Sequence, residues 1–395
     1  MSADGRHGGN LDAILATAAA DRKRLNSNAL GAFSLTLLGV ASVVGAGIFV
    51  VTGDAAAHYA GPAVLISFVL AGIVAGLTAL CYAELAASIP VAGSTYSYAL
   101  AAFGSFVGWF IGWDLLLEYL FAASTVAVGW SGYLASLCAS VGIHIPHDLA
   151  TAPFGSDPGI VNLPALAIML ICSGALYLGT KESAVANNTM VVLKLAILAL
   201  VVGVGIFYVT SSNLEPFVPP HSGGFGDFGW TGILRGAGIV FFAYIGFDAV
   251  STAAAEAREP RRTIPIGLIG TVLIATAIYV AVGFVLTGML NYRQLGVADP
   301  VAAAVHAAGP SLHWLLRLTD IAAVIGLAST VLVTLYGQTR IFMRMSEYRM
   351  PPPAFGKVGK KTKTPHFSIV LCGIVGGTVA ALVPLWTSRP VAAER

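Results

Sequence analysis

The first long apolar segment of the chain is interrupted by VGAGIF at residues 44–49, and the sixth is interrupted by FFAYIGFD at residues 241–248. Glycine lacks a Cβ and stabilises a helix interior poorly, so each stretch is a place where a helix can break. Inside a bilayer, unwound backbone is tolerated only where protein buries it or where it lines a wet cavity. Breaks at corresponding places of two halves predict the binding site of a transporter. The alternative is that these glycines only permit close helix packing.

The composition is that of an integral membrane protein. The chain has 395 residues, of which 57% are hydrophobic and 10% are charged, and its mean hydropathy is +0.82. Soluble domains carry about a quarter charged residues. The net charge of +2 indicates little about partners. The four cysteines lie in apolar segments without CxxC spacing, so neither a zinc site nor a disulfide framework is predicted.

Apolar segments long enough to cross a bilayer, which takes about 20 residues, occur nine times. They lie near residues 31–57, 62–87, 102–138, 161–180, 185–209, 231–255, 263–289, 312–343 and 367–387. Lysine and arginine gather in alternate loops, including residues 22–24, 258–262 and 340–363. Because positive loops stay in the cytoplasm, we expect a multi-pass plasma-membrane protein with a cytoplasmic N-terminus.

Five stretches carry a family resemblance. They are LTLLGVASVVGAGIF at 35–49, YAELAASIPVAGSTYSY at 82–98, GWDLLLEY at 112–119, FFAYIGFD at 241–248 and EAREPRRTIP at 256–265. In this order they resemble the amino acid–polyamine–organocation (APC) superfamily of permeases, in its cationic amino acid transporter branch. The resemblance covers residues 30 to about 382. It implies an all-α polytopic membrane protein with the LeuT-type fold, in which two inverted repeats of five helices are usually followed by two more helices.

This fold implies a division of the chain. We expect a cytoplasmic N-terminal segment at residues 1–29 and a first repeat of five spans at residues 30–210. Residues 230–387 hold spans six to nine of an incomplete second repeat, and residues 388–395 form a tail. Because the tenth span and the helices after it are missing, the sequence is interpreted as C-terminally truncated. The tail beyond about residue 385 is expected to be poorly ordered.

The resemblance implies a secondary active amino acid transporter, a proton symporter that works by alternating access, and no enzyme. Free N–H groups at a helix N-terminus bind a carboxylate, and free carbonyls at a helix C-terminus bind an ammonium. The first break is expected to supply N–H groups, and the second carbonyls. The positions that match the family's substrate contacts are Val43, Ala46, Gly47, Phe242, Ala243 and Ile245. Phe242 matches an aromatic gate, although aromatic side chains also simply fill cores.

Lys194 lies inside the fifth span. A lysine within a membrane segment costs at least ~2.5 kcal/mol by insertion scales, so it is a functional candidate. It could instead snorkel to the interface. By resemblance it matches a lysine of proton-coupled relatives whose ammonium takes the place of a sodium ion. We expect it to bridge the first and eighth spans, near the carbonyls of residues 41–44 and the hydroxyls of Ser329 and Thr330.

Acidic residues occur in two other spans. Asp114 and Glu118 lie four residues apart in the third span and share one helix face. The resemblance assigns Glu118 to the coupling site, whereas Asp114 is interpreted as structural. Asp320, in the eighth span, has Arg317 one turn away as a candidate partner.

Other classes fit the sequence less well. A channel needs rings of charge or filter carbonyls, and an enzyme needs motifs such as HExxH or GxSxG; the sequence shows neither. A non-transporting fragment of a permease remains an alternative. Amino acids, protons and the lipid bilayer are the expected partners, with no nucleic acid, cofactor or metal. The sequence leaves open whether the substrate is a basic or a small neutral amino acid.

Overall fold

The structure, a computed structural model, describes most of the chain between residues 31 and 384. The described ranges are 31–45, 47–88, 94–154, 158–178, 183–252, 257–347, 350–359, 362 and 364–384. The expected N-terminal segment and the tail, including its predicted disorder, lie outside these residues. The division into two repeats stays a prediction.

The described residues form helices of three kinds. The α-helices are α2 (Ala32–Val43), α3 (Thr52–Ala55), α4 (Val64–Ser88), α5 (Ser94–Phe103), α6 (Ser105–Ser140), α7 (His147–Ala150), α8 (Leu163–Leu178), α9 (Ser183–Gly205), α10 (Gly229–Val240), α11 (Ala249–Thr252), α12 (Pro260–Met289), α13 (Pro300–Ala307), α14 (His313–Glu347) and α15 (His366–Leu382). Short π or 3-10 segments are η1 (Gly47–Val51), η2 (Ala56–Ala60), η3 (Gly61–Ala63), η4 (Ile206–Tyr208), η5 (Ser211–Leu214), η6 (Phe241–Tyr244), η8 (Tyr292–Gln294), η9 (Pro310–Leu312) and η10 (Pro353–Gly356).

Five helical runs of the described residues are long and apolar enough to cross a membrane. They are Gly47–Ala86, Ser105–Ser140, Met190–Tyr208, Pro260–Met289 and Pro310–Ser346. Shorter apolar helices are Ala32–Val43, Leu163–Leu178 and His366–Leu382. The first run joins the second half of the first predicted span to the second span, and the chain turns between them at Gly61, whose φ of +59° is a glycine conformation.

Both predicted breaks are present. In the first, α2 ends at Val43, Val44 is extended with ψ 96°, and helical structure resumes as a π turn at Gly47. In the second, α10 gives way to the 3-10 turn η6, and Ile245 is extended with ψ 132°. Gly246 then takes φ +106°, which side chains with a Cβ rarely adopt. The first and sixth spans are therefore discontinuous helices, as the sequence predicted.

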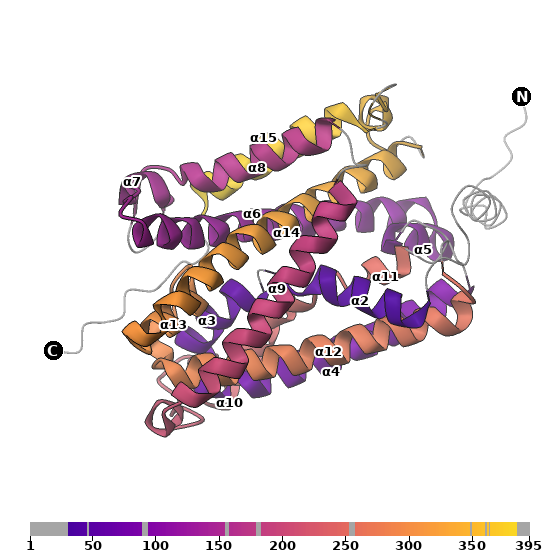
Figure 1. Ribbon diagram of the computed structural model, residues 1–395. Helices are drawn as coiled ribbons and strands as arrows, with labels where there is room; N and C mark the ends of the chain where they lie inside the picture. The colour runs from indigo at the N-terminus through magenta and orange to yellow at the C-terminus, as the bar shows by residue number, and fades with distance from the viewer. Residues whose placement is uncertain are drawn as a thin grey trace, which may run out of the picture.

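The helices pack in two groups, joined by α9, which crosses between them (Figure 1). In one group α12 runs along α4 and also packs on α2. In the other α14 packs on α6, and α15 packs on α8. The contact of α12 with α2 depends on Gly39, because a Cβ there would lie 2.0 Å from the Oγ1 of Thr271. Close packing by glycine thus accompanies the helix breaks and does not replace them.

Candidate functional site

The two breaks lie side by side. A Cβ on Gly47 would stand 2.2 Å from the Cβ of Ala243 and 2.3 Å from its Cα, which no side chain motion can relieve. Segments η1 and η6 therefore touch through glycine and alanine. The absence of a side chain at Gly47 is what allows the two interrupted backbones to meet.

A tyrosine from a third helix joins the two breaks. The hydroxyl of Tyr279, on α12, lies 2.9 Å from the carbonyl oxygen of Val43 and 2.6 Å from that of Ala243. Its side chain is fully buried. The sequence analysis did not select Tyr279. The sequence feature that could have indicated it is a tyrosine hydroxyl in the middle of a largely apolar span.

The expected substrate contacts gather around this meeting point. Val43 and Ala243 are buried, Gly47 is buried, and Phe242 and Ile245 are half-buried. Ala46 lies outside the described residues. All five described positions are uncharged, so the charged groups of a ligand would meet backbone atoms there.

Two of the expected carbonyls already accept hydrogen bonds within the protein. The carbonyl of Phe242 accepts from the N–H of Ile245 at 3.2 Å, and the carbonyl of Ala243 accepts from Tyr279. The sequence analysis expected these carbonyls to be free for an ammonium. In this conformation a ligand would share their second lone pair or replace the internal donor.

Lys194 does not snorkel. Its side chain is 1% exposed, and its ammonium donates to the carbonyl oxygen of Ala41 at 2.9 Å. Gly326 of α14 lies against its aliphatic stem, since a Cβ there would stand 3.0 Å from the Lys194 Cβ. The predicted contact with a carbonyl of the first span is confirmed. The Thr330 hydroxyl, which we expected at the ammonium, donates to the carbonyl of Gly326 at 3.1 Å.

Glu118 and Lys194 lie in different environments. No charged group among the described residues acts on the Lys194 ammonium, which is surrounded by uncharged protein. Glu118 is half-buried on α6, where Asp248 and Asp114 are close enough to repel its charge. The structure thus gathers acids around Glu118 and keeps them away from Lys194.

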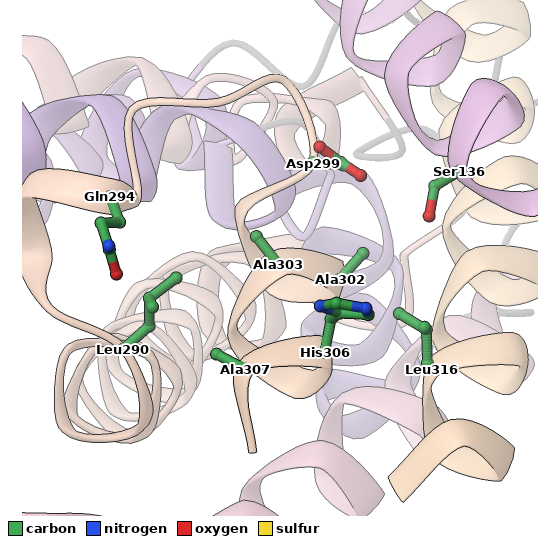
Figure 2. A pocket seen from close by; sticks show the side chains of 9 residues that line it. All are labelled: Ser136, Leu290, Gln294, Asp299, Ala302, Ala303, His306, Ala307 and Leu316. Carbon is green, nitrogen blue, oxygen red and sulfur yellow. The ribbon is translucent and has the colours of Figure 1, made fainter. Parts of the chain in front are cut away.

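A second polar region lies between α6, α12, α13 and α14. It is a cavity of about 380 Å³, which we call the Asp299 cavity (Figure 2). Its lining consists of Ser136, Leu290, Gln294, Asp299, Ala302, Ala303, His306, Ala307 and Leu316. Asp299 lies in the loop before α13, outside the spans, and burial raises the pKa of its carboxyl to about 6. The cavity therefore combines an aliphatic wall with an acidic group.

Asp320 stands beside this cavity, and its expected pairing with Arg317 is wrong. The Ser136 hydroxyl donates to its Oδ2 at 3.0 Å, and its Oδ1 is buried without a hydrogen-bond partner among the described residues. Arg317 is exposed, whereas Asp320 is fully buried. The hydrogen bond from Ser136 of α6 holds the Asp320 carboxylate inside the bundle, whereas the Arg317 side chain lies at the surface.

Comparisons with known proteins identify the family of the chain. The model of the family described as "Amino acid permease" matches residues 30–390. The chain is 44% identical to the methylthioribose transporter of Bacillus subtilis (strain 168), over 91% of this chain and 76% of that protein. It is 43% identical to the branched-chain amino acid permease BcaP of the same organism, over 90% and 75%. It is also 34% identical to the vacuolar cationic amino acid transporter 2 of Arabidopsis thaliana, over 88% and 54%.

Solved structures show the fold. MhsT in complex with L-phenylalanine superposes with a TM-score of 0.62 at 14% identity, over 88% of this chain and 78% of that chain. A Na⁺-coupled sialic acid symporter superposes with a TM-score of 0.57 at 15% identity, over 94% and 78%. Both are transporters of the LeuT-type fold, and the interrupted first and sixth spans found here are its hallmark. This chain is a multi-pass membrane transporter and belongs to the amino acid permease family of the APC superfamily.

Proposed function

We propose that this protein carries a neutral, apolar amino acid together with a proton into the cell by alternating access at the two breaks. The observation that carries the proposal is Lys194, whose buried ammonium ties α9 to the carbonyl of Ala41 on α2 and packs against α14. An ammonium offers three donors and no acceptor, so it can fill an oxygen site that would otherwise hold a small cation. Proton movement at this one group would couple to the contact between three helices.

The proposed substrate class rests on the expected contact positions. Val43, Phe242, Ala243 and Ile245 are aliphatic or aromatic and include no carboxylate that would pair with a basic side chain. A relative 43% identical to this chain is named for branched-chain amino acids. We therefore place valine, leucine and isoleucine ahead of arginine and lysine. The substrate's own carboxylate and ammonium would be met by backbone groups at the breaks.

The coupling step uses the Ala41 hydrogen bond. A hydrogen bond to a charged group contributes about 1.5–3 kcal/mol. When Lys194 gives up its proton to the cytoplasm, the neutral amine that remains can make only a weaker hydrogen bond, of about 0.5–1.5 kcal/mol, and the contact of α2 with α9 and α14 loosens. Reprotonation from the opposite side restores it. In this scheme transport follows the proton gradient and is indifferent to sodium, and the protein lies in the plasma membrane with its N-terminus in the cytoplasm.

The test is uptake into proteoliposomes that contain the purified chain. Labelled leucine, isoleucine and valine should accumulate under an inward proton gradient, with or without sodium, whereas arginine should not. Methylthioribose belongs in the same panel, because a relative 44% identical carries that name. Uptake of methylthioribose alone would reject the amino acid substrate class. A sodium requirement would reject the proton-coupling scheme. No uptake of any compound would favour a non-transporting chain.

A further inference from the structure

The two interrupted helices depend on a single proton donor. The Tyr279 hydroxyl lies within hydrogen-bond distance of the carbonyls of Val43 and Ala243, one from each break. A phenol carries one proton, so it donates to one carbonyl at a time or shares the proton between the two. Both oxygens lie within hydrogen-bond distance of this one hydroxyl, so Tyr279 stands between the two backbones.

The ring of Tyr279 is held in place by its neighbours. It packs between Phe68 and Tyr244, with ring centroids 5.3 Å apart in both cases. The Tyr244 hydroxyl in turn lies 2.9 Å from the carbonyl of Phe68 and 2.9 Å from the Oγ1 of Thr276. All three rings are fully buried. The donor is therefore preorganised, and little conformational freedom remains to be lost when it meets the carbonyls.

We infer that Tyr279 is a positioning residue for the proposed substrate site, and that from α12 it sets the distance between the backbones of the two breaks. It need not touch the substrate, because it acts through the carbonyls of Val43 and Ala243. The two carbonyl oxygens are thereby held close together before a substrate ammonium binds to them. This inference rests on the proposed function for its effect on transport, while its effect on the backbone stands alone.

The first test is Tyr279→Phe, with Tyr96→Phe on α5 as its control. Each variant removes one hydroxyl from a buried tyrosine, but the Tyr96 hydroxyl donates to the Sδ of Met350 and Tyr96 belongs to neither break. Tyr279→Phe should raise the half-saturation concentration of leucine uptake roughly tenfold, with the maximal rate changed far less. Tyr96→Phe should leave the half-saturation concentration near wild type. An equal shift in both variants would overturn the inference.

A second test does not need transport. Hydrogen exchange followed by mass spectrometry should show faster exchange in peptides covering residues 43–51 and 241–248 of Tyr279→Phe, and wild-type exchange there in Tyr96→Phe. If the wild-type chain carries no amino acid, the proposed function fails and this measurement still decides the inference. Unchanged exchange at both breaks in Tyr279→Phe would reject it.

A gentler change covers the case in which Tyr279→Phe does not fold. Site-specific 3-fluorotyrosine at position 279 keeps the ring and hydroxyl and makes the hydroxyl a stronger donor. It should slow exchange in the two break peptides and lower the half-saturation concentration, the opposite of the change expected for phenylalanine. Faster exchange or a raised half-saturation concentration in this variant would contradict the role of the donor.

Discussion

The helix breaks and the Asp299 cavity both place polar groups among apolar helices, but they satisfy them differently. At the breaks, neutral carbonyls meet the Tyr279 hydroxyl, and the Lys194 ammonium meets the carbonyl of Ala41. At the cavity, one carboxylate oxygen of Asp320 is buried without a hydrogen-bond partner among the described residues. The carboxyl group of Asp299 is close enough to repel a charge on Asp320. In one region donors face acceptors, whereas in the other two carboxyl groups face each other.

The difference shows what each region can tolerate. A site made of backbone carbonyls and small residues is sensitive to shape, because an added methyl group forces the backbones apart. A site made of carboxylates is sensitive to pH and charge, because its energy changes with each proton. Substitutions that alter volume should therefore dominate at the breaks, and substitutions that alter charge should dominate at the cavity.

The largest effect is expected for Gly47→Ala. The new Cβ would collide with the Cβ and backbone of Ala243, so the two breaks would have to separate. Misplacement of a site by about 1 Å can cost roughly a hundredfold in rate, and we expect a loss of leucine uptake of this order. Gly76→Ala on α4 is the matched control, because a Cβ there meets nothing within 4 Å. Uptake within twofold of wild type in Gly47→Ala would show that the close contact is not required.

The next effect concerns Lys194→Met, which keeps the aliphatic stem against Gly326 and removes the ammonium. Proton-driven leucine uptake should fall roughly tenfold or more, and the remaining uptake should no longer respond to pH. Lys357→Met, at an exposed lysine, should behave as wild type. The measurement is uptake with and without an inward proton gradient. Wild-type pH dependence in Lys194→Met would exclude this lysine as the coupling group.

Sequence reasoning reached the breaks and Lys194 because their signals are local. Glycines inside apolar spans, and a lysine inside another, can be read without knowing which helices touch. Tyr279 was missed because its two acceptors lie 236 and 36 residues away, and a tyrosine in an apolar helix does not indicate which carbonyl it faces. The occupied carbonyls at the second break were missed for the same reason.

The Asp299 cavity was missed because it depends on contacts between distant segments. Ser136 and Asp320 are 184 residues apart in the chain, so the nearby Arg317 was the only partner that spacing could suggest. Residues three apart on a helix are neighbours, but this spacing does not indicate which of the two a second helix will bury. Local patterns thus identified the elements, and the packing of α6 against α14 decided the partner.

At the cavity, Asp320→Leu should stabilise the protein. A buried carboxylate without a compensating cation costs free energy, and an aliphatic side chain of similar volume removes that cost, for a gain of roughly 1–3 kcal/mol in the free energy of unfolding. Thermal unfolding in detergent measures the change, and Asp320→Asn, which keeps an oxygen for Ser136, should fall between wild type and Asp320→Leu. Leucine uptake should stay within twofold. A less stable Asp320→Leu protein would mean that the carboxylate has a cationic partner.

The smallest expected effect is the pH dependence of stability due to Asp299. Burial raises the pKa of its carboxyl from the ordinary 3.8 to about 6 in the folded protein. Below about pH 4 the carboxyl is protonated in both the folded and the unfolded chain, so it makes no difference to stability. Between pH 4 and 6 the unfolded chain loses this proton first, and the free energy of unfolding therefore falls as pH rises.

Asp299→Asn removes this titrating group, so it tests whether the stability of the cavity depends on pH as that of the uncharged breaks does not. Because the side chain is partly exposed and water screens part of the cost, the variant should gain about 1–2 kcal/mol over wild type at pH 7 and nothing at pH 4. Thermal unfolding of both proteins in detergent across pH 4–8 measures the difference. Asp148→Asn, at a carboxylate that is 68% exposed, should give a curve parallel to wild type. Parallel curves for Asp299→Asn as well would show that Asp299 titrates as a solvated carboxyl, and that the cavity is open to water at its acidic end.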